Sequence, residues 1–192
     1  MSALDDAPEV HADDAAAWRA WLEANHAATR GAWLIMRRRQ AGGQGLGYEA
    51  AVEEALCFGW VDSTRRGLDD ERNKLYFAQR KPGSAWAATN KARVGRLIDE
   101  GRMAPAGLAA IELAKANGSW ETLDATERLE IPADLAAALD ARPPAAANFV
   151  AFPPSARKIL LGWVAMARRP ETRAGRIDQI ATAAARNERA RR

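Results

Sequence analysis

The chain has 192 residues, a length that fits one domain or one domain with a small helical addition. Hydrophobic residues make up 48% and charged residues 28%, which is typical of a soluble globular protein. The net charge of +3 at pH 7 is too small to indicate nucleic-acid binding by itself. The single cysteine, Cys57, excludes an internal disulfide and a cysteine-based metal site.

The first residues, MSALDDAPEVHADDAA, are acidic and contain no apolar core. Residues 1–12 are predicted to form a disordered tail. The same composition argues against a secretory signal or a transit peptide. No apolar stretch in the sequence approaches the length of a membrane span. We therefore expect a cytoplasmic protein without a membrane span.

Residues 13–120 are predicted to form an α+β core. Asp13 or Asp14 can cap a first helix that carries Trp18 and Trp21 on one face. The following segment, GAWLIMRRR, is typical of a strand. The glycines of QAGGQGLG then predict a flexible loop, whose spacing is not that of a phosphate-binding loop.

A helix is predicted from Tyr48 to Trp60, because apolar residues repeat there at i, i+3, i+4, i+7 and i+8. This pattern gives one buried face and places Glu49, Glu53 and Glu54 on the solvent side. Phe58 lies off the apolar face, so the helix is expected to unwind near Gly59.

A hairpin is predicted next, with the strands WVDSTRRGL and KLYFAQRK joined by DDERN. A turn centred near Glu71 would place Asp62 opposite Arg80, and Thr64 opposite Ala78. Opposed residues share a face of the sheet, so Asp62 and Arg80 are predicted to form an ion pair. A register slip of one residue would send the two side chains to opposite faces.

The turn at Pro82 and Gly83 is predicted to precede another helix, with Ser84 as its N-cap. On this helix Trp86 and Asn90 would share one stripe. Residues 121–152 contain short Ala- and Pro-rich pieces and are predicted to be a helical connector. Residues 153–192 are predicted to form a C-terminal helical hairpin with a basic tail. The predicted fold is therefore α+β, with a small three-stranded antiparallel sheet packed by helices and a helical C-terminal region.

The candidate ligand-binding site consists of polar side chains placed among tryptophans: Trp60, Asp62, Arg80, Ser84, Trp86 and Asn90. A buried carboxylate needs a partner, and Arg80 is the predicted partner of Asp62. Two interpretations stay open. The pair either fixes the fold, or it lines a cleft for a small polar or anionic ligand.

Catalytic motifs give no positive support for an enzyme. His11 lies in the predicted tail and His26 ends the first helix, so neither is placed to activate Cys57, which is expected to be a core residue. The acids of LDDE lack the spacing of a calcium loop, and no metal or cofactor is predicted. An unrecognised enzyme with Asp62 as acid or base stays open as an alternative.

A second alternative is binding of nucleic acid or another polyanion by a basic patch at one end of the C-terminal hairpin, made of Arg168, Arg169, Arg173 and Arg176. Acidic residues alternate with these arginines and weaken this alternative. A protein partner is also possible on the sequence alone.

Three segments, in order, resemble the bacterial YdeI/OmpD-associated proteins, also called bacteriocin-protection proteins. The segments are GYEAAVEEALCFGWVDS, RKPGSAWAATNKARVGRLIDEGRMAPAGL and SARKILLGWVAMARRPETRAGRI. The resemblance implies a role in stress tolerance, including survival of bacteriocins or antimicrobial peptides, and a porin partner. It brings no catalytic residues, so the expected function is non-enzymatic binding or stress protection in the cytosol.

Overall fold

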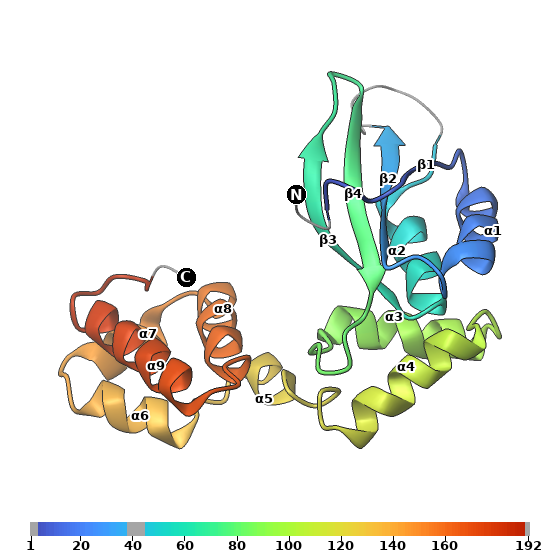
Figure 1. Cartoon of the computed structure of the whole chain (residues 1–192). Helices are drawn as coiled ribbons and strands as arrows, with labels where there is room; N and C mark the ends of the chain where they lie inside the picture. Colours follow the sequence, from blue (N-terminus) through green and yellow to red (C-terminus); the bar gives the residue numbers. More distant parts are fainter. Residues whose placement is uncertain (1–3, 38–44, 191–192) are drawn as a thin grey trace. The chain divides into compact units, whose positions relative to one another are not determined.

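The structure is a computed structural model that describes residues 4–37 and 45–190. The chain divides into two compact units, each of which is described by itself (Figure 1). The first unit contains Met1–Ser84 and Thr89–Asn117, and the second contains Ala85–Ala88 and Gly118–Arg192. Part of the predicted glycine-rich loop, residues 42–44, lies outside the described residues, as do two arginines of the predicted strand exit, residues 38–39.

The described residues of the first unit form a four-stranded sheet in the order β1-β2-β4-β3. Its strands are β1 (Glu9–His11), β2 (Gly31–Arg37), β3 (Trp60–Gly67) and β4 (Arg72–Gln79). Strand β1 runs parallel to β2, whereas β4 is antiparallel to both β2 and β3. The α+β class is confirmed. The prediction of three antiparallel strands is wrong, because the sheet is mixed and has a fourth strand.

Strand β1 lies within the segment that was expected to be a disordered tail. Its three residues are too few to produce a recognisable alternation of apolar and polar side chains. The strand is held by tertiary contacts instead. Val10 is buried and pairs with Leu34, and the Trp33 amide donates to the Pro8 carbonyl over 2.9 Å. The tail prediction therefore fails for these residues.

Helices α1 (Ala15–Asn25) and α2 (Tyr48–Cys57) belong to the first unit, as do α3 (Ala88–Asp99) and α4 (Pro105–Ala116). Helix α1 begins where predicted, because an Asp14 carboxylate oxygen accepts from the Ala17 amide over 2.8 Å. Its buried Trp18 ring lies 5.4 Å from the ring of Phe77 on β4. In Figure 1, α2 lies behind the sheet and the dark blue N-terminal segment crosses in front of β4.

At the junction between α2 and β3, the predicted unwinding near Gly59 is confirmed, whereas the predicted continuation of the helix to Trp60 is wrong. Helix α2 ends at Cys57, and Trp60 is the first residue of β3. Gly59 between them has φ +72°, a left-handed conformation that glycine adopts without steric strain. A Cβ at this position would also lie 3.0 Å from the Ala110 Cβ. The chain therefore changes direction at Gly59.

The hairpin register also differs from the prediction. Asp62 lies opposite Phe77, and the irregularity between Asp62 and Arg65 shifts the register along β3. The turn lies earlier than expected, because the Asp69 carboxylate accepts from the amides of Glu71 and Arg72. The predicted opposition of Asp62 and Arg80, and of Thr64 and Ala78, is therefore wrong.

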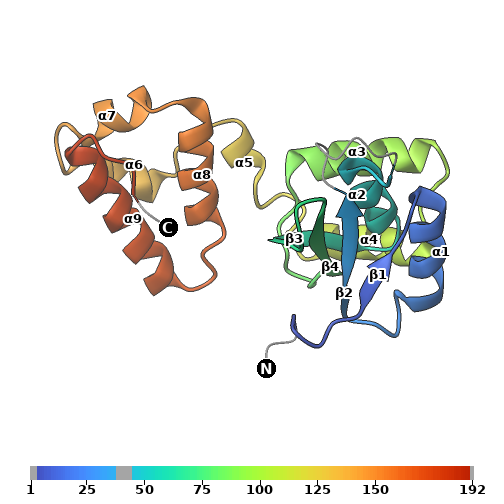
Figure 2. The same ribbon diagram turned by 90° about the horizontal axis from the view of Figure 1, so that it is seen from above.

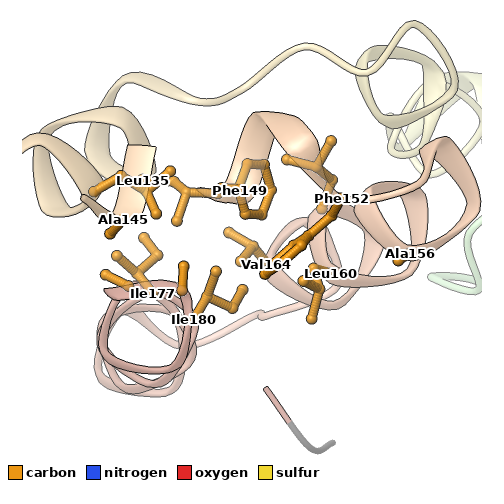
Figure 3. Close-up of a cluster of buried hydrophobic side chains, with 13 residues drawn as sticks. Leu135, Ala145, Phe149, Phe152, Ala156, Leu160, Val164, Ile177 and Ile180 are labelled. Carbon is orange, nitrogen blue, oxygen red and sulfur yellow. The ribbon is translucent and has the colours of Figure 1, made fainter. Parts of the chain in front are cut away.

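The second unit contains short helices around one apolar core: α5 (Asp124–Glu127), α6 (Ala133–Asp140), α7 (Ala145–Ala151), α8 (Pro154–Ala165) and α9 (Pro170–Ala185). Helix α9 packs against α6, α7 and α8. Figure 3 shows Leu135 of α6 and Phe149 of α7 in the same cluster as Ile177 and Ile180 of α9. Residues 121–152 are therefore part of this helical unit and do not form a connector.

None of the helices in the described parts of the chain is long and apolar enough to cross a membrane.

Candidate functional site

The six candidate residues do not form one group. Trp60, Asp62, Arg80, Ser84 and Asn90 belong to the first unit, whereas Trp86 belongs to the second. There, Trp86 is almost fully buried and its ring lies 5.0 Å from the ring of Trp120. Trp86 is therefore a buried residue that packs on Trp120 of the helical unit and does not line the candidate site.

Ser84 does not cap a helix, because α3 begins only at Ala88. The Ser84 amide donates to the Lys81 carbonyl over 2.9 Å, which closes the turn at Pro82 and Gly83. The four residues after this turn are not helical, so Trp86 and Asn90 do not share a helical stripe.

Trp60 is fully buried and its ring meets the edge of Trp21 at 5.9 Å between centroids. Its indole Nε1 has no hydrogen-bond partner among the described residues. Trp60 thus fills the core beside the candidate site and does not line an exposed cleft.

Asp62 is half-buried on β3 and accepts a hydrogen bond from the Tyr48 hydroxyl over 3.0 Å. Tyr48 is the first residue of α2, so this bond joins the helix to the edge strand of the sheet. Burial, followed by the charge of Asp62, raises the pKa of the Tyr48 hydroxyl. The Arg65 guanidinium lies over the Tyr48 ring, 5.4 Å from its centroid.

Arg80 follows β4 directly and is half-buried. Its amide donates to the Gly59 carbonyl over 3.0 Å, which fixes its backbone at the α2–β3 junction. Burial lowers the pKa of the Arg80 guanidinium to about 10, and the charge of Asp62 offsets only part of this effect. The two residues therefore interact electrostatically although they are not opposed in the sheet.

Arg93 of α3 joins this group and was not predicted from the sequence. Two of its nitrogens donate to the Glu49 carboxylate over 2.8 and 2.7 Å, and a third donates to the Asn90 side-chain oxygen over 2.7 Å. The bond to Glu49 raises the pKa of Arg93, and the charge of Asp62 acts in the same direction. Its spacing of three residues from Asn90 on a helix was the available signal. The residues Tyr48, Glu49, Asp62, Arg80, Asn90 and Arg93 are called the Asp62 cluster below.

A second charged group, the glutamate–arginine network, contradicts the predicted solvent side of α2. Glu53 and Glu54 are only 7% and 5% exposed. Glu54 accepts from Arg19 over 2.9 Å and from Arg102 over 2.6 Å. Glu53 accepts from Arg96 and from Arg102. Every carboxylate of this network is engaged by at least two guanidinium groups, so its role is structural.

Cys57 lies beside this network and is fully buried. Burial, followed by the charge of Glu54, raises the pKa of its thiol. A raised pKa disfavours the thiolate, which is the nucleophilic form. Among the described residues, no group of three or more histidines, cysteines and carboxylates is placed to hold a metal ion.

Two arginines of the predicted polyanion patch form contacts within the helical unit. Arg173 donates to both carboxylate oxygens of Asp134 over 2.6 and 2.9 Å. Arg176 donates to the Trp163 carbonyl, and its guanidinium lies 5.2 Å from the Trp163 ring centroid. Arg168 and Arg169 are exposed. Two of the four arginines are thus committed to holding α9 in place.

Two family models match the chain. One is described as a domain of unknown function (DUF8412) and covers residues 10–110, which include the Asp62 cluster. The other is described as bacteriocin-protection, YdeI or OmpD-associated, and covers residues 128–187 of the helical unit. No curated protein and no solved structure matches the chain. The second match confirms the resemblance through its third segment, SARKILLGWVAMARRPETRAGRI, whereas the first two segments lie within the match to the domain of unknown function.

Proposed function

We propose that the chain is a non-enzymatic binding protein that acts in stress protection in the cytosol, a role suggested by the match of residues 128–187 to the family model described as bacteriocin-protection, YdeI or OmpD-associated. The proposed ligand is a small anion, and the proposed binding site is the Asp62 cluster of the first unit. Neither family description names a ligand, so this assignment rests on the geometry and charge of the cluster.

The observation that carries the proposal is the environment of Arg80. Arg80 is half-buried, its guanidinium donates to the Ser84 carbonyl over 3.5 Å, and burial lowers its pKa to about 10. A guanidinium that has lost part of its hydration gains free energy when an anion bonds to it. Arg80 would therefore supply the main charge for ligand recognition.

The neighbouring side chains support the same ligand class. Arg93 is held in place by Glu49 and Asn90, and the Tyr48 hydroxyl is held by Asp62. A rigid guanidinium loses little conformational entropy on binding, whereas the Tyr48 hydroxyl donates its only proton to Asp62 and has none to offer an anion. Asp62 repels anions and would set a limit on affinity. The cluster thus favours an anion that can bond to Arg80 while it stays away from Asp62.

Anions should stabilise the protein through Arg80. At constant ionic strength, saturating phosphate or citrate is expected to raise the thermal unfolding midpoint by about 3 °C. The substitution Arg80→Gln should abolish this shift, because the charge that attracts the anion is lost. Asp62→Asn should enlarge it, because the repelling charge is removed. Differential scanning fluorimetry measures the shift for each variant relative to its own anion-free midpoint.

Arg128→Gln is the matched control, because Arg128 is exposed in the other unit and pairs with Glu130. This variant should keep the wild-type shift. If phosphate and citrate leave the wild type unshifted, or if Arg80→Gln retains the full shift, the cluster is a structural ion-pair group and the proposed site is wrong.

The cellular role predicts a second result. Cells that lack the protein should be killed at lower concentrations of a bacteriocin or antimicrobial peptide, and expression of the wild-type chain should restore survival. Arg80→Gln should restore less than half of the effect if the anion site is required. Survival counts at equal expression level, with Arg128→Gln as control, measure this. Equal killing with and without the protein would rule out the protective role.

A further inference from the structure

The face of the sheet opposite α1 and α2 carries aromatic and basic side chains. Directly opposed residues on neighbouring strands share a face. Trp33 lies opposite Tyr76, and Arg66 lies opposite Lys74. These four residues are called the aromatic–basic face below. Phe77, the neighbour of Tyr76 in sequence, points to the other face, where it meets Trp18 of α1.

The four side chains are organised around the Trp33 indole. The Arg66 guanidinium carbon and the Lys74 Nζ each lie 5.0 Å from the ring centroid of Trp33. The Tyr76 ring meets the Trp33 ring at 5.1 Å between centroids. Two cations on one aromatic ring attract carboxylates while the ring supplies apolar contact area.

Gly31 keeps this arrangement open. A Cβ at Gly31 would lie 2.2 Å from the Tyr76 hydroxyl oxygen and 2.9 Å from the Phe77 carbonyl oxygen. Glycine therefore allows the Tyr76 side chain to lie across β2 toward Trp33. The packing of Tyr76 on Trp33 in the aromatic–basic face thus depends on a glycine at position 31.

The segment Leu4–Glu9 of the same chain occupies this face and is called the acidic segment below. The Trp33 indole nitrogen donates to the Leu4 carbonyl over 2.7 Å. Arg66 pairs with Asp5 at 3.5 Å, and Lys74 pairs with Glu9 at 2.5 Å. The acidic segment therefore meets the face with one backbone carbonyl and two carboxylates.

These contacts differ in how much water reaches them. Both side chains of the Asp5–Arg66 pair are open to water, at 50% and 45% exposure, whereas in the Glu9–Lys74 pair Glu9 is 44% and Lys74 only 19% exposed. An ion pair as exposed as Asp5–Arg66 contributes little to stability, because water competes for both charges. By contrast, Trp33 is only 2% exposed, so its apolar ring must stay shielded from water by some segment. An outside segment would have to replace these side-chain contacts and also the backbone bond of the Trp33 amide to Pro8 and the pairing of Glu9 with Trp33.

We propose that the aromatic–basic face binds an acidic, extended peptide segment of a partner protein, and that the acidic segment is its intramolecular competitor. The partner's carboxylates would bond to Arg66 and Lys74, and one of its backbone carbonyls would accept from the Trp33 indole. The contacts of the acidic segment favour a peptide, because a backbone carbonyl is what the indole nitrogen already binds. This site is separate from the Asp62 cluster.

The probe is a fluorescein-labelled peptide with the sequence of residues 3–12, ALDDAPEVHA, added to the full-length protein. Fluorescence anisotropy should detect weak binding to the wild type. Asp5→Asn combined with Glu9→Gln should bind the peptide about fivefold more tightly, because the internal competitor is weakened. Arg66→Gln combined with Lys74→Gln should abolish binding, and Arg66→Gln alone should weaken it.

Arg128→Gln combined with Lys158→Gln is the matched control, because these exposed residues pair with Glu130 and Glu127 in the other unit. It should bind like the wild type, and a peptide with its three acids replaced by amides should not bind. The proposal fails if loss of Asp5 and Glu9 charge leaves the affinity unchanged, or if Arg66→Gln binds like the wild type. It also fails if the neutral peptide binds equally well, or if a thymidine oligonucleotide binds this face and the peptide does not.

Discussion

The substitution Glu54→Ala is expected to lower the free energy of unfolding of the first unit by about 3 kcal/mol. Glu54 is buried, and its carboxylate accepts from both Arg19 and Arg102. Its removal takes the most buried carboxylate partner away from both guanidinium groups, and leaves Arg19 with the exposed Glu23 and Arg102 with Glu53 and Glu100. The two arginine side chains keep 30% and 33% exposure, which holds the cost at the lower end for a broken buried pair. Urea unfolding followed by circular dichroism measures the change.

The control for Glu54→Ala is Glu23→Ala, which removes another carboxylate partner of Arg19. Glu23 is 58% exposed and lies one helical turn from Arg19, so its loss should cost less than about 0.5 kcal/mol. Similar costs for the two variants would mean that the glutamate–arginine network behaves like a surface ion pair.

Gly107→Ala is expected to destabilise the first unit by about 3 kcal/mol. Helix α4 approaches the end of α2 so closely that a Cβ at Gly107 would lie 2.2 Å from the Cys57 carbonyl oxygen. The same carbonyl accepts from the Ala104 amide over 3.0 Å, so it cannot move away without loss of that bond. Thermal and urea unfolding of the full-length protein measure the effect.

Gly95→Ala is the matched control and should have the opposite sign. Gly95 lies within α3, and a Cβ there would meet no atom within 4 Å. Alanine should therefore stabilise the helix by about 0.5–1 kcal/mol through its better helix propensity. If Gly107→Ala were as well tolerated as Gly95→Ala, α4 could not be packed on α2 as closely as the structure has it.

The sequence predicted those features that depend on local periodicity. The apolar stripe of residues 48–57 predicted helix α2, and Asp14 as a capping residue predicted where α1 begins. The burial of Glu53 and Glu54 could not be predicted in the same way. Their partners Arg19, Arg96 and Arg102 lie far away in the sequence and come together only in the folded unit.

The register of Asp62 and Arg80 was not predicted correctly. A local irregularity in β3 and the early turn at Asp69 replaced the expected register, although the charge of Asp62 still acts on the pKa of Arg80. Neither feature follows from residue alternation, because a bulge changes the count of residues on one strand only. Tyr48 and Arg93 were missed because they reach the site from two separate helices.

The extent of the helical unit was predicted too small, because the helices within residues 121–152 are short. Helix α6 has eight residues and α7 has seven, too few for a clear amphipathic period. Their buried residues Leu135, Leu139 and Phe149 find a core only together with α9. A sequence window over 121–152 shows alanine and proline but not this long-range packing.

The assignment of Ala85–Ala88 to the second unit has a consequence for dissecting the protein. The chain leaves the first unit after Ser84, contributes Trp86 as a ring neighbour of Trp120 to the second, and returns at Thr89. A single cut after Asn117 would therefore leave Trp86 on the wrong fragment and strip the Trp120 ring of its neighbour. Fragments of the C-terminal half should expose a tryptophan surface and aggregate, so the activities of the two units are best separated by point substitutions in the intact chain.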